Sequence, residues 1–313
     1  PAYLDDAYLD ALLESGFNRF SLGVQDINTD VLKNVNRDPS AIPLERIRDR
    51  IRASVSGAAL NLDLIYGLPG QDAASFSASI DKAIEIGPDR LVTFAYAHVP
   101  WLKKHQVILE KKGLPGPGER TAMYMVAYEK MINAGYHPVG LDHFVRTGDE
   151  LHRALQDRQL HRNFQGYCTR ETTGQVYAFG NSAISQLDRA YLQNVKDADQ
   201  YTARIMSGQP AVEKGLELTA AQVLTREVIT RIMCNRSISW DETAAFLGTP
   251  KEHILDITGY DVDGLTELQR DGILEFSEEG LQVTEKGSMF IRNVAALFDP
   301  AYEPQEKKYS RSV

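Results

Sequence analysis

Side chains that could bind a polar ligand stand within two short apolar runs and in a loop-rich stretch near the middle of the chain. Gln25 and Asp63 carry an amide and a carboxylate in the two runs. The middle stretch contains Asp142-His143-Phe144 and, from His161 to Tyr167, the residues His-Arg-Asn-Phe-Gln-Gly-Tyr. Amide, carboxylate, imidazole and guanidinium groups recognise polar ligands and transfer protons. The sequence therefore offers ligand-binding chemistry from two separate regions.

The spacing of these residues does not match a metal site. Four of the seven histidines lie between His137 and His161, but no pair has the spacing of a helical zinc site. Cys168 and Cys234 are far apart in the sequence. For any one histidine taken alone, a hydrogen-bonded structural role is the simpler alternative. The sequence predicts no metal site in this chain.

Three predicted β-strands position the first group of polar residues: Arg19–Gln25, Leu60–Ile65 and Leu91–His98. Segments of helical periodicity lie between and around them, at 5–15, 44–54, 74–86 and 120–133. This alternation of strands and helices predicts parallel strands joined by right-handed crossovers, an α/β fold.

The alternation within each predicted strand separates an apolar face from a small or polar one. The apolar face suits packing beneath the helices and carries Phe20, Leu22, Val24, Leu60, Leu62, Leu64, Val92, Phe94 and Tyr96. The opposite face carries Ser21, Gly23, Gln25, Asn61, Asp63, Ile65, Thr93, Ala95 and Ala97. Closed barrels normally fill their interior with bulky aliphatic side chains, so this face predicts an open cavity.

Gln25, Asp63 and Ala97 are expected to share one layer of this cavity, near the carboxyl ends of the strands where α/β folds bind ligands. The alternative is an antiparallel sheet with one solvated face, which the helical crossovers disfavour.

Composition excludes several classes of function. The 313 residues carry 43 acidic and 34 basic side chains, a net charge of -9, which disfavours nucleic acid as a partner. No apolar run approaches the roughly 18 residues that a membrane span needs, and no secretory signal pattern is visible. With only two cysteines, a reducing, cytoplasmic setting is expected.

From about Thr219 the pattern changes to helices with a small β element. Thr219 with Gln222, and Ser239 with Glu242, have the spacing of capping boxes at helix starts. The predicted order of helix, strand, turn, strand and helix over 265–297 resembles a winged helix. Residues 215–299 hold 15 acidic and seven basic side chains, however, and DNA binding needs the opposite sign. A winged-helix regulator is therefore disfavoured.

Several motifs occur in order along nearly the whole chain: Gly16-Phe17-Asn18-Arg19, Gly23-Val24-Gln25-Asp26, Asn36-Arg37, Asp63-Leu64-Ile65-Tyr66-Gly67-Leu68-Pro69, Asp142-His143-Phe144, the His161–Tyr167 segment and Ser182-Ala183-Ile184-Ser185. Together they resemble the oxygen-independent coproporphyrinogen III oxidases, radical S-adenosylmethionine (SAM) enzymes of haem biosynthesis. The second and fourth motifs also occur in related haem chaperones, whereas the His161–Tyr167 segment resembles the oxidases more narrowly.

The resemblance implies the C-terminal half of a partial (β/α)6 radical-SAM barrel followed by a mostly helical, winged-helix-like domain. It divides the chain into an incomplete barrel (1–140), a loop-rich segment that completes the active site (141–214) and the helical C-terminal domain (215–313). The family's C-x-x-x-C-x-x-C loop for a [4Fe-4S] cluster is not in this sequence. We therefore expect a C-terminal fragment that is inactive alone and contributes no cluster ligand.

By position in these motifs, the resemblance implies SAM contacts for Gln25, Arg37, Asp63, Ala97 and Ile184. It places Ile65, Phe164 and Gln165 near a second SAM or the substrate. His161 and Arg162 are candidate cations for the substrate propionates. The facing argument supports Gln25, Asp63 and Ala97 independently; Ile184 rests on the resemblance alone.

The implied reaction converts two propionates of coproporphyrinogen III to vinyl groups and gives protoporphyrinogen IX. It would use SAM, a [4Fe-4S] cluster, an electron donor and an electron acceptor, in a protein expected to be monomeric when complete. The alternative is a haem chaperone that binds haem without decarboxylation. Ile27 stands where the family usually has phenylalanine, which leaves open a paralogue with another tetrapyrrole substrate.

Overall fold

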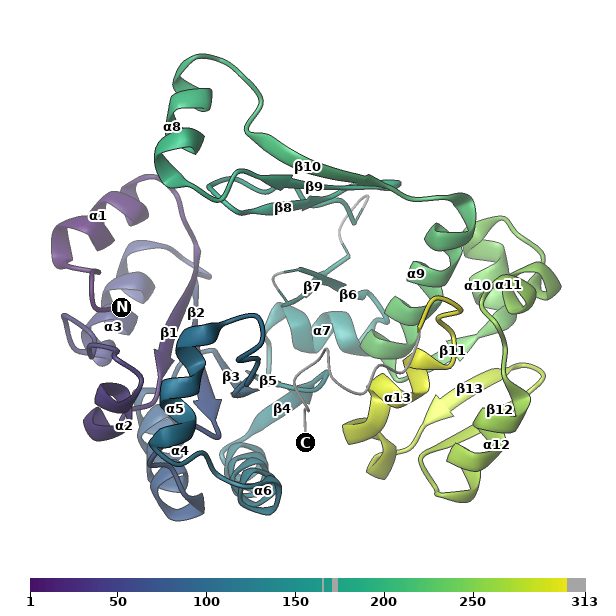
Figure 1. Ribbon diagram of the computed structural model, residues 1–313, viewed down its shortest axis with the longest axis horizontal. Coiled ribbons are helices and arrows are strands. Elements are labelled where there is room, and N and C mark those ends of the chain that lie inside the picture. The colour runs from purple at the N-terminus through teal and green to yellow at the C-terminus, as the bar shows by residue number, and fades with distance from the viewer. Residues whose placement is uncertain (165, 171–173, 303–313) are drawn as a thin grey trace. The chain divides into compact units, whose positions relative to one another are not determined.

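The computed structural model describes residues 1–164, 166–170 and 174–302 (Figure 1). These residues form two compact units, of which the first spans Pro1–His152 and the second begins at Arg153. The predicted division into segments 1–140, 141–214 and 215–313 stays a prediction.

The first unit is built on a mixed sheet with the strand order β1-β2-β3-β5-β4. β1 (Arg19–Gln25), β2 (Ala59–Tyr66) and β3 (Arg90–Ala95) are parallel neighbours, which confirms the predicted arrangement of the three strands. β5 (His143–Arg146) pairs antiparallel with β3 and with β4 (Tyr136–Val139). The α/β class is confirmed, while the partial (β/α)6 barrel stays a prediction.

Helices join the parallel strands at the predicted places. The first unit contains α1 (Asp6–Glu14), α2 (Thr29–Asn34), α3 (Leu44–Ser54), α4 (Ala73–Ile86), the 3-10 helix η1 (Lys104–Gln106), α5 (Val107–Lys111) and α6 (Pro117–Asn133). α4 begins with a reciprocal cap between Asp72 and Ser75 and ends at Gly87, which adopts the left-handed conformation that a residue without Cβ accommodates. Local sequence chemistry therefore sets both ends of this crossover.

The core of the first unit lies between the sheet and these helices. Alternate residues of β2, from Leu60 to Leu64, are fully buried and pack in one cluster with Phe76 and Ile80 of α4. Apolar side chains of α3 and α6 complete the cluster, so burial of one sheet face is what holds the crossovers in place.

The predicted facing of the third strand is wrong by one residue. In the parallel register Leu64 neighbours Thr93, and Ile65 neighbours Phe94. Thr93 and Ala95 therefore share the helix-covered face, whereas Phe94 shares the face of Ile65. A shift of one residue exchanges the two faces of a strand. The sequence concealed it because Leu91, Val92 and Thr93 are all buried, without the alternation that reveals a face.

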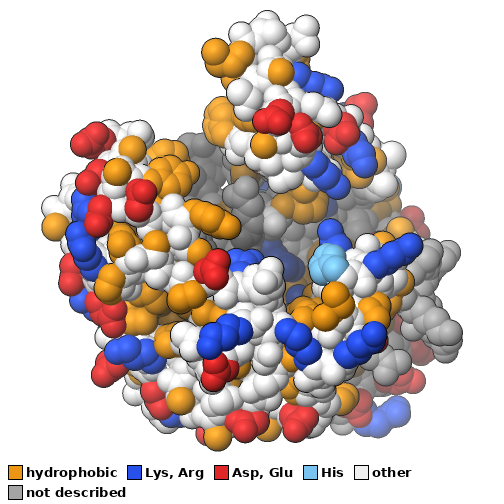
Figure 2. Space-filling model, turned by 60° about the vertical axis from the view of Figure 1, so that its left-hand side comes forward, with side chains coloured by type: hydrophobic (Ala, Val, Ile, Leu, Met, Phe, Trp, Pro, Cys, Tyr) orange, Lys and Arg blue, Asp and Glu red, His pale blue; other side chains and the backbone are white. Residues whose placement is uncertain are grey.

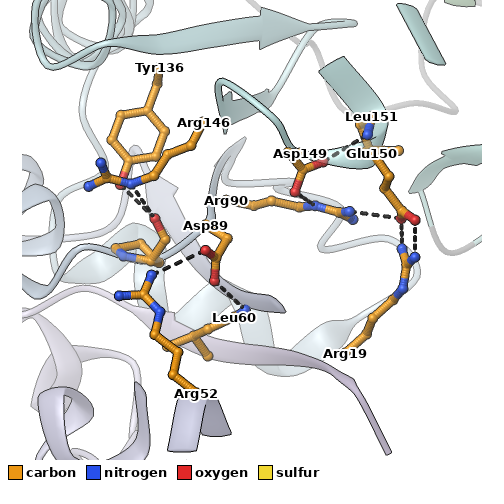
Figure 3. Close-up of polar contacts among 11 residues, drawn as sticks. Arg19, Arg52, Leu60, Asp89, Arg90, Tyr136, Arg146, Asp149, Glu150 and Leu151 are labelled. Atoms are coloured by element: carbon orange, nitrogen blue, oxygen red, sulfur yellow. Dashed lines mark hydrogen bonds and ion pairs between the residues drawn. The ribbon is translucent and has the colours of Figure 1, made fainter. Parts of the chain in front are cut away.

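An ion-pair network ties the beginnings of the parallel strands to the start of α7 (Glu150–Gln156) (Figure 3). Arg90 at the start of β3 donates to Asp149 and Glu150, both at 2.8 Å, and Glu150 also pairs with Arg19 at the start of β1. Asp89 accepts the backbone N–H of Leu60 at 2.9 Å. These contacts lie at the amino ends of the strands, opposite the expected ligand-binding end.

The second unit contains small sheets and the C-terminal helices. Its strands are β6 (Leu160–Asn163), β7 (Gly166–Thr169), β8 (Ile184–Gln186), β9 (Ala190–Asn194), β10 (Val212–Glu217), β11 (Ser237–Ser239), β12 (Leu274–Ser277) and β13 (Gly280–Val283). Its helices are α8 (Ala198–Met206), α9 (Ala220–Asn235), α10 (Trp240–Leu247), α11 (Lys251–Ile257), α12 (Val262–Arg270), η2 (Lys286–Phe290) and α13 (Ile291–Ala296).

The helix starts predicted in this unit are confirmed. Thr219 and Gln222 form the reciprocal cap of α9, and Ser239 accepts the backbone N–H of Glu242 at the start of α10. The hairpin of β12 and β13 pairs with β11, and the winged-helix comparison stays a prediction.

Candidate functional site

A cavity of about 610 Å³ opens at the carboxyl ends of β1, β2 and β3. Its size falls in the range of small-molecule sites in proteins. Predicted residues Gln25, Arg37 and Ile65 line it, together with Asn34, Val35, Asn36, Leu68, Tyr96, His105, Gln106, Ile108, Leu109 and Lys112. The structure therefore brings three of the predicted site residues to one cavity, at the end of the sheet where α/β folds bind ligands.

Gln25 is placed in this cavity by an irregularity at the end of β1. The register with β2 shifts between Gly23 and Gln25, and Gln25 adopts a left-handed backbone conformation with φ of 69°. A Cβ at Gly23 would lie 2.6 Å from the Gln25 side-chain nitrogen, so the amide folds back over a position that only glycine leaves open. Such bulges re-aim side chains near functional sites.

The next residue, Asp26, ties the end of β1 to the loop after β2. Asp26 is 1% exposed, and its carboxyl group accepts hydrogen bonds from Gln71 Nε2 at 2.6 Å, Ser79 Oγ at 2.5 Å and the backbone N–H of Asn28 at 2.8 Å. Gln71 Nε2 also donates to the carbonyl of Ile65 at 2.8 Å. One buried carboxyl group therefore fixes both strand ends that border the cavity.

Arg37 follows α2 and presents an exposed guanidinium at the cavity wall. Its backbone N–H donates to the carbonyl of Leu32 at 2.9 Å, which anchors the turn after the helix. Nearby, Lys112 donates to the carbonyl of Asn34 at 2.7 Å. The cavity consequently has cationic groups to which an anionic part of a ligand could bind.

Tyr96 is the site residue that sequence reasoning missed. The misassigned face of the third strand had placed it among the helix-packed residues, yet it lines the cavity. Its hydroxyl is buried and has no hydrogen-bond partner among the described residues. Burial, reinforced by the charge of Glu110, raises the pKa of Tyr96, so the hydroxyl stays protonated. Because Tyr96 lines the cavity and its buried hydroxyl is unpaired among the described residues, a polar ligand could supply the missing hydrogen-bond partner.

Asp63 and Ala97 stand apart from the cavity lining. Asp63 accepts hydrogen bonds from Ser21 Oγ at 2.9 Å and Asn61 Nδ2 at 2.7 Å. These polar side chains lie on the same face of the sheet as Ile65, but nearer to the beginnings of the strands. Ala97 lies beyond the end of β3, is exposed and does not line the cavity. The predicted layer of Gln25, Asp63 and Ala97 is therefore wrong, and Tyr96 accompanies Gln25 instead.

The remaining predicted site residues belong to the second unit. Phe164 is exposed and meets the ring of Tyr191 edge to face at 5.1 Å, and Ile184 is half-buried at the start of β8. Arg162 lies over the ring of Tyr167 at 5.5 Å. Gln165 lies outside the described residues.

His161 is buried in β6 and is a poor cation. Its Nε2 lies 3.2 Å from the side-chain nitrogen of Gln186, and its Nδ1 has no partner among the described residues. Burial, with the charge of Arg170 as the next cause, lowers the pKa of His161 below its ordinary value. The neutral imidazole is favoured at neutral pH, so His161 suits hydrogen bonding better than charge neutralisation.

Within the described part of the chain, no three His, Cys, Asp or Glu side chains converge in a way that could hold a metal ion. None of the described helices combines the length and apolar character required to cross a bilayer. On the face drawn in Figure 2, basic and acidic side chains are interspersed, unlike the continuous basic surface typical of nucleic-acid binding.

Comparison with known proteins supplies the family. Residues 218–290 match the HemN C-terminal domain. The oxygen-independent coproporphyrinogen III oxidase of Synechocystis sp. is 34% identical over all of this chain and 67% of its own length. The Escherichia coli oxidase is 35% identical over 96% of this chain and 64% of its own length.

A solved structure is similar throughout. Coproporphyrinogen III oxidase (HemN) from Escherichia coli, described as a radical SAM enzyme, matches with a TM-score of 0.84 at 33% identity. The match covers 96% of this chain and 68% of that one, so the chain spans about two thirds of the length of such relatives. The chain belongs to the oxygen-independent coproporphyrinogen III oxidases, a family of radical SAM oxidoreductases of haem biosynthesis.

Proposed function

We propose that the protein carries out the oxidative decarboxylation of coproporphyrinogen III propionates to vinyl groups, giving protoporphyrinogen IX, with SAM bound in the 610 Å³ cavity. The observation that carries the proposal is the cavity itself, where Gln25 is held in a strained conformation over Gly23 and the Tyr96 hydroxyl has no partner among the described residues. Backbone strain of this kind persists where the surrounding structure requires it and is concentrated at functional sites.

The residues of the cavity fit SAM chemically. Arg37 is a permanent planar cation that can pair with the methionyl carboxylate, and the Gln25 amide offers a donor and an acceptor to hydroxyl or amino groups. When bound, SAM supplies the group that abstracts hydrogen from the substrate. The task of this chain is to hold it close to one substrate carbon and to exclude water.

Roles for the other predicted residues rest on the family resemblance. Asp63, Ala97 and Ile184, which do not line the cavity, are proposed to contact the parts of SAM that extend beyond it. Ile65, His161, Arg162, Phe164 and Gln165 are proposed to border a second SAM or the substrate. For His161 the lowered pKa supports a hydrogen bond to substrate rather than an ion pair.

The residues of this chain do not fit a [4Fe-4S] cluster. A cluster needs closely placed thiolates, but this sequence carries only Cys168 and Cys234. Burial raises the pKa of the Cys234 thiol to about 12, which keeps it protonated. The cluster of a radical SAM enzyme would thus need ligands other than the residues of this sequence. An electron donor, an electron acceptor and a monomeric assembly complete the proposal.

The test is turnover by the full-length protein, reconstituted with iron and sulfide without oxygen. We expect SAM cleavage and conversion of coproporphyrinogen III to protoporphyrinogen IX. Arg37→Met should weaken SAM binding about 10- to 100-fold, the value of a lost charge-assisted contact, and Arg46→Met, which removes an exposed arginine paired with Asp6, should not. Stable haem binding without vinyl formation would refute the proposal and favour a haem chaperone.

A further inference from the structure

A second cavity, of about 260 Å³, lies wholly within the second unit and has no part in the proposed reaction. Its lining residues belong to the segment that leads into β6, to the position after β7 and to α9, β11 and α10. Figure 1 labels these elements. Arg158, Arg170 and Arg231 line the cavity together with Phe246 and Glu242. At this volume the cavity is smaller than most cofactor sites, so it suits a small ligand.

Two of these arginines are held rigidly. Arg170 donates to both carboxyl oxygens of Glu227, at 2.6 and 3.0 Å, and Arg231 Nε donates to the same residue at 3.0 Å. Both guanidinium groups also lie against the ring of Phe246, with their central carbons 4.6 and 4.5 Å from its centroid. Fixed guanidinium groups lose little conformational entropy when they bind a ligand.

The charges at the cavity do not balance. Burial raises the pKa of Glu227, but the hydrogen bond and charge of Arg170, followed by the charge of Arg231, outweigh it and leave that pKa below its ordinary value. Glu227 is therefore ionised, and Glu242 pairs with Arg158 at the exposed side of the cavity, at 3.3 Å. Among the described residues, three arginines thus face two carboxylates, which leaves one positive charge.

Among the described residues, Arg231 has N–H groups that are free to bind a ligand. Arg231 uses its Nε for Glu227, and its two Nη groups have no hydrogen-bond partner among the described residues. The side chain of Arg231 is 20% exposed and that of Arg170 is 24% exposed, so a ligand in the cavity can reach both. Guanidinium donors of this kind match the geometry of phosphate and carboxylate oxygens.

We propose that this cavity, formed by Arg158, Arg170, Arg231 and Phe246, is a binding site for a small oxyanion, a phosphate or carboxylate group. The fixed guanidinium groups supply the donors, and the bound anion neutralises the charge that the two glutamates leave over.

The test is calorimetric titration of the full-length protein with inorganic phosphate, with sulfate and with acetate, each at constant ionic strength. We expect saturable binding of one anion per chain. Preference for phosphate or sulfate would assign the site to tetrahedral oxyanions, and preference for acetate to carboxylates. Arg231→Met should weaken the binding about 10- to 100-fold.

Arg189→Met, which removes an exposed arginine of the same unit outside the cavity, is the matched control and should bind as the wild type does. Arg158, whose side chain is 64% exposed, provides a variant that should fold normally even if Arg231→Met does not. Arg158→Met should bind the anion several-fold more weakly. Absence of saturable binding to the wild type, or equal affinity in the two cavity variants and the control, would overturn the proposal.

Discussion

Replacing Asp26 with asparagine changes one atom of a buried carboxyl group and should loosen the wall of the 610 Å³ cavity. One carboxyl oxygen accepts from Ser79 Oγ and the Asn28 backbone, and the other accepts from Gln71 Nε2. In the asparagine side chain one of these oxygens becomes an NH₂ group. Whichever way the amide is turned, a donor then faces a donor.

Gln71 cannot relieve the clash by turning its own amide. Its Oε1 accepts the backbone N–H of Leu68 at 2.7 Å, and its Nε2 donates to the carbonyl of Ile65 at 2.8 Å. Rotation would break both bonds. An unsatisfied buried donor lowers stability by about 1 to 3 kcal/mol. Because two donors would face each other, we expect Asp26→Asn to lower the unfolding free energy by about 3 kcal/mol, the upper end of this range.

Urea unfolding followed by fluorescence measures the loss, and a SAM titration of the same protein measures the effect on the cavity. Asp30→Asn is the matched control, because the Asp30 side chain is 81% exposed and pairs with neighbouring Lys33 on the surface. It should change stability by less than about 0.5 kcal/mol. If Asp26→Asn were as stable as the wild type, the buried network would not hold the two strand ends in the way described.

Three further changes probe other parts of the structure. Gly23→Ala should displace the Gln25 amide and weaken SAM binding with little loss of stability, whereas Gly118→Ala, where an added Cβ meets nothing within 4 Å, should leave affinity unchanged in the same titration. Arg90→Met removes the cation that pairs with Asp149, whose side chain is 4% exposed, and should lower the unfolding free energy by about 3 kcal/mol. The exposed control Arg46→Met should lower it by less than about 1 kcal/mol. Folding lowers the pKa of His161, so just below about pH 6.5 the unfolded chain binds more protons than the folded chain, and the protein becomes less stable as the pH is lowered through this range. His161→Asn should make urea midpoints measured across this range less dependent on pH, and an unchanged slope would contradict the assignment.

Much of the first unit could be predicted because its signals are local. The alternation in β1 and β2, and the glycine that ends α4, each depend on a few neighbouring residues. The facing of β3 could not be read because both of its faces are buried near Leu91 and Val92. The hydrogen bonds of Asp26 could not be predicted from the sequence either, because its partners Gln71 and Ser79 lie 45 and 53 positions further along the chain. Contacts of that range depend on how the strands and helices pack.

A crystal structure of the full-length protein with SAM would show directly whether SAM occupies the 610 Å³ cavity. We expect the nucleotide in the cavity between Gln25, Ile65 and Tyr96, with its carboxylate at Arg37 and the Tyr96 hydroxyl now hydrogen-bonded. SAM bound elsewhere, with this cavity left to solvent, would contradict it.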